Sequence, residues 1–352
     1  MSNDGKQPLL FYQPPEPQET EYRVGLCSWQ DKSMIEQGKF YPRKTMQAEE
    51  RLWWYSQYFD TVEVNSTFYA PLSPMNAVMW AKRTPDHFLF NVKAYALLTG
   101  HHLDAVRLPV ELKDLLPATA QPNRRGQFEN QLFAQEARDW AFETFRQALI
   151  PLQDTGKLGY VLFQFAPWVK YGDQAMAYLE SLPARLPGVT IAVEFRDRSW
   201  IPEHTDEVLH HLAQHGISYV SIDAPVLESG VPPILALTSP VAVLRLHGRN
   251  TAGYLKQLRG EQPAVAEKYD YLYSKEEITE LADKARGLRR HARRVYVGFN
   301  NNHEDFPAIN GMQLVEELLG RTPPDRDALV AARRKKKPTA NSQQPSLFTS
   351  GT

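Results

Sequence analysis

Charged side chains stand at the ends of apolar, strand-like stretches at several places in this chain. Glu194 and Arg196 follow the apolar run 189–193, and Arg245 and His247 end another apolar run. Side chains two residues apart on a strand share one face, so each pair is presented together. A carboxylate or an imidazole beside guanidinium groups is suited to proton transfer on an anionic substrate. These residues are therefore the first candidates for chemistry.

The same spacing recurs in other segments and places further polar residues on one face at the strand ends. In parallel barrels, sites lie at the carboxyl ends of the strands, so we expect these residues to converge. The candidates for catalysis are Glu63, Glu194, Asp223 and His247. The candidates for ligand binding are Asn65, Lys93, Gln164, Arg196, Arg245 and Asn300.

Three interpretations of this set stay open. In the first, the four catalytic candidates bind a divalent metal that activates water, although no HxH or HExxH spacing supports it. In the second, the cations hold a phosphate or carboxylate group while a carboxylate or His247 moves protons. In the third, the charges only neutralise one another at the top of a barrel. Because desolvated ion pairs rarely increase stability, the set favours a ligand site.

Strand-like and helix-like stretches alternate along the chain. Apolar stretches with polar ends predict strands at 23–29, 61–65, 88–93, 160–165, 189–193, 218–223, 241–247 and 294–300. Helical spacing predicts helices at 47–59, 74–82, 128–152, 173–182, 202–215, 275–291 and 312–319. This alternation gives a parallel sheet, and eight repeats favour a closed (β/α)8 TIM barrel. No GxGxxG motif follows the first strand, which argues against a dinucleotide-binding fold.

The composition of the chain indicates one globular domain with a different segment at the N-terminus. Of 352 residues, 42% are hydrophobic and 23% are charged, as is ordinary for a globular protein. Residues 1–21 are rich in Pro, Gln and Glu and lack the pattern of a signal peptide, so we expect a disordered lead before a barrel domain at 22–321. The single cysteine, Cys27, excludes an intrachain disulfide and favours a reducing, cytoplasmic location. No apolar run is long enough to span a bilayer.

Several motifs occur in an order that resembles a known protein family. They are GLCSW (25–29), FYP (40–42), EVNSTFY (63–69), FNVK (90–93), EFR (194–196), RLHGR (245–249), YDYLY (269–273) and GFNN (298–301). Over about residues 22–320 the chain resembles the "domain of unknown function 72" family, also called YecE-like. The resemblance implies a TIM barrel and leaves the reaction open. At Thr99-Gly100-His101 it also marks His101 as a ligand-binding candidate.

Further residues extend the expected site. Arg249 with Asn300–Asn302 predicts a phosphate site, since TIM barrels often bind phosphate after their last two strands, although the asparagines alternatively shape a turn. Trp29 and Trp200 belong to the core or rim, and either ring is also suited to stacking on a base or a sugar. Cys27 is expected to be a buried structural thiol and not a nucleophile.

The C-terminal residues 322–352 have a different character. Six basic residues stand there against two acidic ones, and the composition of the segment predicts disorder. The pentapeptide 344–348 resembles the motif with which bacterial replication and repair proteins bind the sliding clamp. By that resemblance Gln344 would make polar contacts, and Leu347 and Phe348 would fill an apolar pocket. The alternative is a solvated tail without a partner.

These observations predict a TIM-barrel enzyme that acts on an anionic, phosphate-bearing substrate, either a small molecule or a nucleic-acid fragment. The reaction would be phosphodiesterase-like hydrolysis or other acid–base chemistry. The formal net charge of the chain is −1 although its tail is basic, so the barrel is acidic and broad nucleic-acid binding by it is not expected. The alternative is a non-catalytic binding module that the tail tethers to the clamp.

Overall fold

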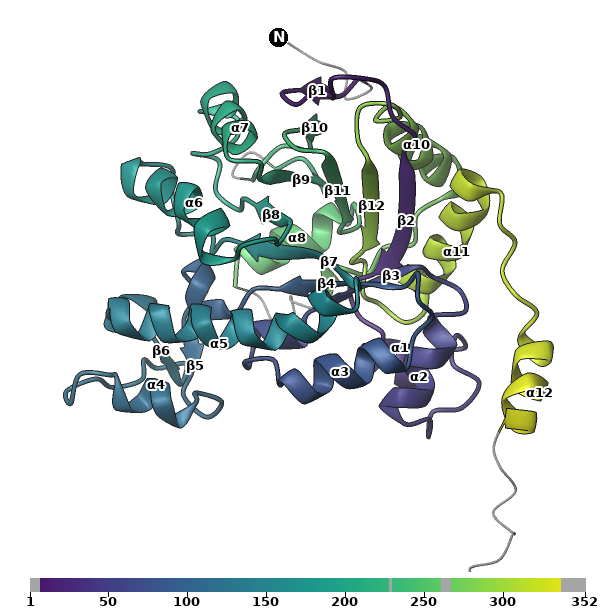
Figure 1. The fold of residues 1–352 in the computed structure, drawn as a ribbon, viewed down its shortest axis with the longest axis horizontal. Coiled ribbons are helices and arrows are strands. Elements are labelled where there is room, and N and C mark those ends of the chain that lie inside the picture. The colour runs from purple at the N-terminus through teal and green to yellow at the C-terminus, as the bar shows by residue number, and fades with distance from the viewer. Residues whose placement is uncertain (1–6, 228–229, 261–266, 337–352) are drawn as a thin grey trace, which may run out of the picture.

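The computed structural model describes residues 7–227, 230–260 and 267–336. Eight parallel strands close into a barrel in the order β11-β12-β2-β3-β4-β7-β8-β9 (Figure 1). The predicted (β/α)8 TIM barrel is therefore confirmed. Its strands are β2 (Glu21–Leu26), β3 (Thr61–Val64), β4 (Leu89–Lys93), β7 (Leu158–Gln164), β8 (Ile191–Glu194), β9 (Ser218–Asp223), β11 (Val241–Leu246) and β12 (Arg294–Phe299).

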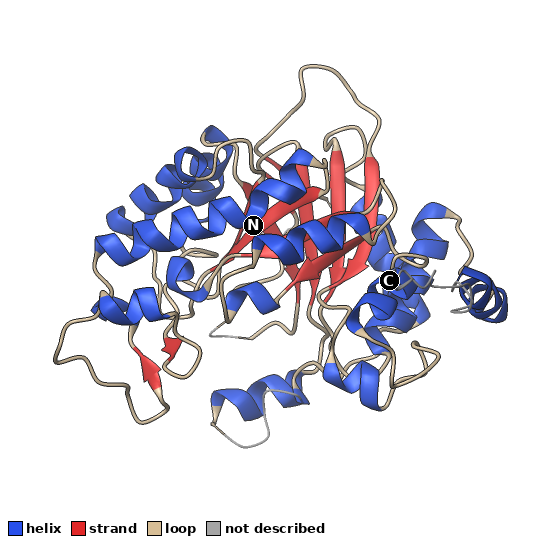
Figure 2. Cartoon of the chain, turned by 60° about the horizontal axis from the view of Figure 1, so that its bottom comes forward, coloured by secondary structure: helices blue, strands red, loops and turns tan. Residues whose placement is uncertain are grey.

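Helices surround the strands, as Figure 2 shows with helices in blue and strands in red. Local sequence signals fix several helix ends. Pro74 lies in the first turn of its helix, and Ser274 and Glu277 form a capping box at the start of another. The main helices are α2 (Ala48–Tyr55), α3 (Pro74–Lys82), α5 (Gln135–Asp154), α6 (Asp173–Arg185), α7 (Thr205–Gln214), α10 (Lys275–Arg286) and α11 (Phe306–Leu319).

The core has two layers that the barrel wall separates. The larger layer packs the outward side chains of the strands against the helices. The inner layer fills the barrel with a smaller set of side chains, so the barrel is a packed core and not a pore. Its members are Leu89, Tyr160, Leu162, Ala192, Val220, Val241, Val243 and Tyr296, with Ile222 partly buried against them.

The N-terminal segment packs on the barrel from residue 7 onward, where its composition predicts disorder. The short strand β1 (Leu9–Leu10) pairs in parallel with β10 (Ala236–Leu237). The amide of Leu9 donates to the carbonyl oxygen of Leu235 over 2.8 Å, and Phe11 packs edge-on against His210. The apolar run 9–11 favours this contact, because the contact partly buries three large side chains.

The long connection before α5 contains a small antiparallel hairpin, β5 (Leu103–Asp104) with β6 (Gln127–Phe128), and the short helix α4 (Val110–Asp114). The hairpin lies apart from the barrel strands in Figure 2. Two further short helices, α1 (Lys32–Glu36) and α8 (Thr251–Leu258), follow β2 and β11. None of these five elements is predicted from the sequence.

The chain also continues beyond residue 321 as the helix α12 (Arg326–Lys336), where we expect disorder. The guanidinium of Arg333 lies 4.8 Å from the ring centroid of Trp53 on α2. That of Arg326 donates to the carbonyl oxygen of Tyr41 over 3.3 Å. The clamp-like pentapeptide 344–348 lies outside the described residues. Within the described ranges, no helix has the length and apolar character needed to cross a membrane.

The barrel wall leaves no room for a side chain at Gly25. A Cβ atom there would lie 2.0 Å from the carbonyl oxygen of Thr61 on the next strand, whereas one on its neighbour Gly298 would lie 3.5 Å from the sulfur of Cys27. We therefore expect Gly25→Ala to lower the free energy of unfolding by about 1–3 kcal/mol or more, as overpacking of a core does. Gly298→Ala is the matched control and should cost clearly less. Urea denaturation of both variants tests this, and equal losses would contradict it.

Candidate functional site

Seven of the predicted residues meet at the carboxyl end of the barrel, which we call the mouth. They come from β3, β4, β7, β8 and β11 or from the residues that follow these strands. Hydrogen bonds and ion pairs connect six of them, and the seventh, His247, has its Nε2 atom 3.5 Å from Oε1 of Glu194. This mouth cluster consists of Glu63, Lys93, Gln164, Glu194, Arg196, Arg245 and His247.

Arg245 is the centre of the mouth cluster and is 1% exposed. Its Nη2 atom lies 2.7 Å from Oε1 of Glu63, and its Nη1 atom pairs with Oε2 of Glu194. Burial by itself lowers the pKa of Arg245, but the two carboxylates outweigh burial and raise it well above its usual value. Tyr160, directly below, donates to the second oxygen of Glu63 over 3.3 Å. The guanidinium is therefore fixed between two carboxylates.

Glu194 is fully buried and has cations on both sides. Its Oε1 atom pairs with Arg196 and lies 3.5 Å from Nε2 of His247. Burial raises the pKa of Glu194, but the charges of Arg196 and Arg245 outweigh burial and hold it well below its usual range. Glu194 is therefore ionised, and it orients two arginines.

One oxygen atom receives three cationic donors. Oε1 of Gln164 lies 3.2 Å from Nζ of Lys93, 3.1 Å from Nη2 of Arg196 and 3.2 Å from Nη1 of Arg245. Gln164 and Lys93 are both partly exposed at the mouth. Such an arrangement brings positive charge to one point from three different strands, which is the geometry that holds an oxyanion.

Lys93 differs from the arginines because its charge depends on pH near neutrality. Burial lowers its pKa to about 8, and the charge of Arg245 acts in the same direction. The Nζ atom also lies 4.4 Å from the ring centroid of Phe68. A lysine in such surroundings both binds anions and exchanges protons.

Two histidines near the mouth are neutral. Burial lowers the pKa of His247 to about 3, and Nδ1 of this ring lies 2.9 Å from the amide nitrogen of Asn300. Burial likewise lowers the pKa of His101 to about 3, and Thr99 holds its Nδ1 atom over 2.8 Å. Both rings therefore act as polar, uncharged groups at pH 7.

A cavity of about 630 Å³ opens above the mouth cluster. The predicted residues Asn65, His101 and Asn300 line it together with Glu63 and Lys93. Asn65 also donates to the carbonyl oxygen of Cys27 over 2.6 Å and so ties β3 to β2. Four aromatic residues also line the wall: Trp29, Phe68, Tyr69 and Tyr269.

Cys27 lies at the floor of this cavity and is not exposed. Burial raises the pKa of its thiol well above the usual value, and the neighbouring Glu63 adds to this effect. A thiol that stays protonated is a poor nucleophile. Trp200 is also fully buried, stacked on Phe195 with ring centroids 4.4 Å apart. Cys27 and Trp200 are therefore both buried core residues.

The structure corrects the prediction for Asp223. On β9, Val220 and Ile222 belong to the inner layer, so Asp223 faces the helices. It pairs in register with Leu246, which packs in the outer layer. The strand SYVSID has apolar residues on both faces. Counting back from its polar end therefore assigns the wrong face to the barrel interior.

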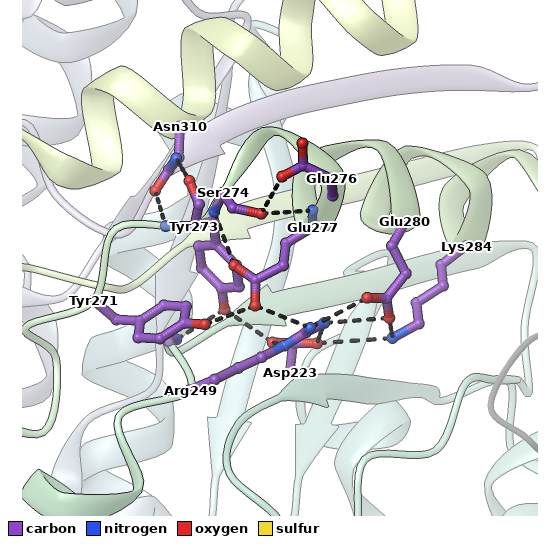
Figure 3. Close-up of polar contacts among 11 residues, drawn as sticks. Asp223, Arg249, Tyr271, Tyr273, Ser274, Glu276, Glu277, Glu280, Lys284 and Asn310 are labelled. Carbon is purple, nitrogen blue, oxygen red and sulfur yellow. Dashed lines mark hydrogen bonds and ion pairs between the residues drawn. The ribbon is translucent and has the colours of Figure 1, made fainter.

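Arg249 lies with Asp223 and not in the cavity. Its Nη2 atom is 2.7 Å from Oδ2 of Asp223, and Figure 3 shows both side chains among residues of α10. Of the expected phosphate site Arg249 with Asn300–Asn302, only Asn300 and Asn302 line the cavity, because Asn301 is buried and donates to the carbonyl oxygen of Tyr271. Arg249 is therefore not placed to bind a ligand in the mouth.

Asp223 and its partners Arg249 and Tyr273 brace the loop that leaves the mouth after His247. Tyr273 donates to Oδ1 of Asp223 over 3.0 Å (Figure 3), and the amide of Gly248 donates to the hydroxyl oxygen of Tyr273 over 2.9 Å. Gly248 has a left-handed backbone with φ of 82°, which a residue with a Cβ would adopt only under strain. Asp223 thus positions the turn beside His247.

The four residues predicted to bind a metal do not come together in the mouth. Asp223 points away, and Arg245 lies between Glu63 and Glu194. Among the described residues, ligand atoms of three His, Cys, Asp or Glu side chains come within 4.8 Å of one another only at Glu180, His211 and His215, on α6 and at the end of α7.

The sequence analysis does not identify Tyr160, Phe68 or Tyr269 as part of the site. Tyr160 shares its strand face with Gln164, so the alternation that selects Gln164 also contains a signal for it. Phe68 ends the short 3-10 helix Ser66–Phe68 and Tyr269 lies in a turn, and the neighbours of both are set by tertiary packing. Tyr269 has its ring centroid 6.5 Å from that of His247.

A closed parallel barrel defines a TIM-barrel protein, and the charged residues at the carboxyl ends of its strands form a candidate site at the usual location for this fold. Residues 23–333 match the family described as "Protein of unknown function DUF72". The chain belongs to this family, as its motifs predict.

Three similar proteins support the assignment. The UPF0759 protein YunF of Bacillus subtilis is 31% identical over 298 residues, which cover 84% of this chain and 94% of that protein. The crystal structure of a DUF72 family protein from Thermotoga maritima is 28% identical, with a TM-score of 0.65 over 86% of this chain and all of the other. One from Enterococcus faecalis is 23% identical, with a TM-score of 0.67 over 85% of this chain and 95% of the other.

The lowered pKa of Lys93 has a consequence for stability. This pKa is about 8 in the folded chain against 10.5 for a free lysine, so the unfolded state binds more protons between these values and wild-type stability rises with pH across them. We expect Lys93→Met to be more stable than wild type at pH 7, by up to about 3 kcal/mol. The advantage should shrink as the pH rises from 8 to 10.5.

Denaturation curves over this pH range test the expectation. Lys113→Met, which replaces an exposed lysine on α4, is the control and should change stability little at any pH. A Lys93→Met variant that is less stable than wild type at pH 7 would show that the lysine charge stabilises the mouth.

Proposed function

We propose that this protein is an enzyme that acts on an anionic, phosphate-bearing substrate at the mouth of the barrel. The observation that carries the proposal is the convergence of Lys93, Arg196 and Arg245 on the single oxygen of Gln164, at 3.1 to 3.2 Å. A phosphate oxygen that takes part in this arrangement would receive charge-assisted hydrogen bonds from fixed donors.

The charge balance of the mouth cluster supports an anionic ligand. Three cations, Lys93, Arg196 and Arg245, face two carboxylates, Glu63 and Glu194, while His247 is neutral. The cluster therefore has an excess positive charge when Lys93 is protonated. Its low exposure strengthens this field, because the surrounding protein screens charges less than water does.

The residues have separable roles in the proposed reaction. Glu194 stays ionised and orients Arg196 and Arg245, which bind the anionic group. Glu63 and Lys93 line the cavity and are the groups that exchange protons with a substrate. With a pKa of about 8, Lys93 can bind an anion as a cation and release a proton near neutral pH. Phosphodiester hydrolysis is one reaction that uses such a set.

Glu63→Gln and Lys93→Met separate binding from turnover. Calorimetry with inorganic phosphate and nucleoside monophosphates should give binding to wild type and to Glu63→Gln, and about tenfold or more weaker binding to Lys93→Met. Turnover of a panel of phosphate mono- and diesters should fall by about 10²–10⁴-fold in Glu63→Gln, as expected for loss of a general base. Wild-type binding weakens as the pH rises through about 8, because Lys93 loses its charge.

Lys113→Met is the control for both measurements, since it removes a lysine on α4 away from the cavity lining. Absence of phosphate binding by the wild type would refute the proposed ligand class. Binding without turnover of any ester would leave a binding protein in place of an enzyme.

A second proposal concerns the tail. In it, the barrel is a non-catalytic binding module that the pentapeptide 344–348 tethers to the bacterial sliding clamp. The support is the sequence resemblance in Gln344, Leu347 and Phe348. A nucleic-acid fragment would then be a suitable ligand for the mouth, since the clamp encloses DNA.

A peptide spanning 341–352 tests the tail directly. We expect it to bind a bacterial sliding clamp in fluorescence anisotropy, because Leu347 and Phe348 offer apolar anchors for a pocket. A peptide with Leu347→Ala and Phe348→Ala should lose binding, and one with Thr349→Ala should keep it. Equal anisotropy for all three peptides would remove the tethering proposal and leave the proposed site in the barrel untouched.

A further inference from the structure

We propose that Glu180, His211 and His215 form a binding site for a transition-metal ion, with Zn²⁺ as the best match, on the outer layer of the barrel between α6 and α7. The site goes beyond the proposed function, because it shares no residue with the mouth. Its effect would be to cross-link α6 and α7.

The two histidines have the spacing of a helical chelating pair. His211 lies in the last turn of α7, and His215 is the residue at which the helix ends. Residues four apart share one helix face, and the two ring centroids are 4.6 Å apart. Glu180, one turn before the end of α6, adds a carboxylate. The ligand atoms of the three side chains all lie within 4.8 Å of one another.

The ring of His211 is already oriented by the neighbouring helix. Its Nε2 atom lies 3.2 Å from the carbonyl oxygen of Met176 on α6. A carbonyl oxygen only accepts, so Nε2 carries the hydrogen and the neutral ring keeps its lone pair on Nδ1. A backbone carbonyl that holds the second ring nitrogen is the usual support for a metal-binding histidine. Met176 and Glu180 are one turn apart, so the same stretch of α6 supplies both the support and the carboxylate.

The third ligand is available for a metal. Among the described residues, the exposed Glu180 has no hydrogen-bond or ion-pair partner, whereas Asp139 on α5 pairs with Arg185 at the end of α6. Two imidazoles and one carboxylate are a donor set that Zn²⁺ accepts, with water completing a tetrahedron. Harder ions such as Mg²⁺ prefer oxygen ligands and would bind poorly here.

Calorimetric titration of the full chain with Zn²⁺ alone, after removal of any affinity tag, tests the proposal. We expect the wild type to bind one ion per chain at pH 7.5 and to melt several degrees higher with the ion than without it. Separate His211→Ala and His215→Ala variants should lose affinity by more than about tenfold, and Glu180→Gln should weaken binding.

His210→Ala is the matched control. His210 is adjacent to His211, but it is exposed on another face of α7 and contacts the carbonyl oxygen of Asp206. This variant should bind Zn²⁺ as the wild type does. Circular dichroism without the ion shows whether each variant is folded, and Co²⁺ adds a visible absorption band typical of tetrahedral sites.

Three outcomes would overturn the proposal. They are absence of Zn²⁺ binding by the wild type, unchanged binding in folded His211→Ala and His215→Ala variants, and an equal loss of binding in His210→Ala. None of these results bears on phosphate binding at the mouth, so the two proposals stand or fall separately.

Discussion

A buried guanidinium held by two carboxylates is the constraint on which the mouth of this barrel depends. Arg245 contacts Glu63 on β3 and Glu194 on β8, and all three side chains are at most 2% exposed. Buried charges are costly to desolvate, and removing one partner leaves the others uncompensated. The three strand ends must therefore converge. The convergence brings Gln164 into contact with the same guanidinium, and Lys93 donates to the same Gln164 oxygen. Stability and the candidate chemistry rest on the same atoms.

Alternation along the strands predicts most of this site. On β3, β4, β7, β8 and β11, the face that ends in polar residues is the barrel interior, so Glu63, Lys93 and Arg245 are found from the sequence. The rule fails at β9, where Ile222 faces inward and Asp223 outward. That strand is apolar on both faces, and only its register against β11 decides which residues face the interior.

Other features are beyond a reading of local pattern because they join distant segments. The periodicity of α7 puts His211 and His215 on one face, but nothing in it places Glu180 beside them. The apolar run 9–11 contains a signal for burial, yet its partner strand begins at Ala236. The contact of Arg333 with Trp53 likewise depends on how α12 returns to α2. Composition alone predicts disorder at both ends, since it counts residue types and not the surfaces they meet.

The first and last strands of the barrel pair with each other, and this affects the order in which the barrel forms. The first barrel strand, β2, pairs with the last, β12, in a register that joins Glu21 to Arg294. During synthesis β2 emerges early and keeps one edge without its final neighbour until almost the whole domain has been translated. An open strand edge invites pairing with other chains. The nascent protein can therefore aggregate through this edge until β12, which ends at residue 299, has left the ribosome.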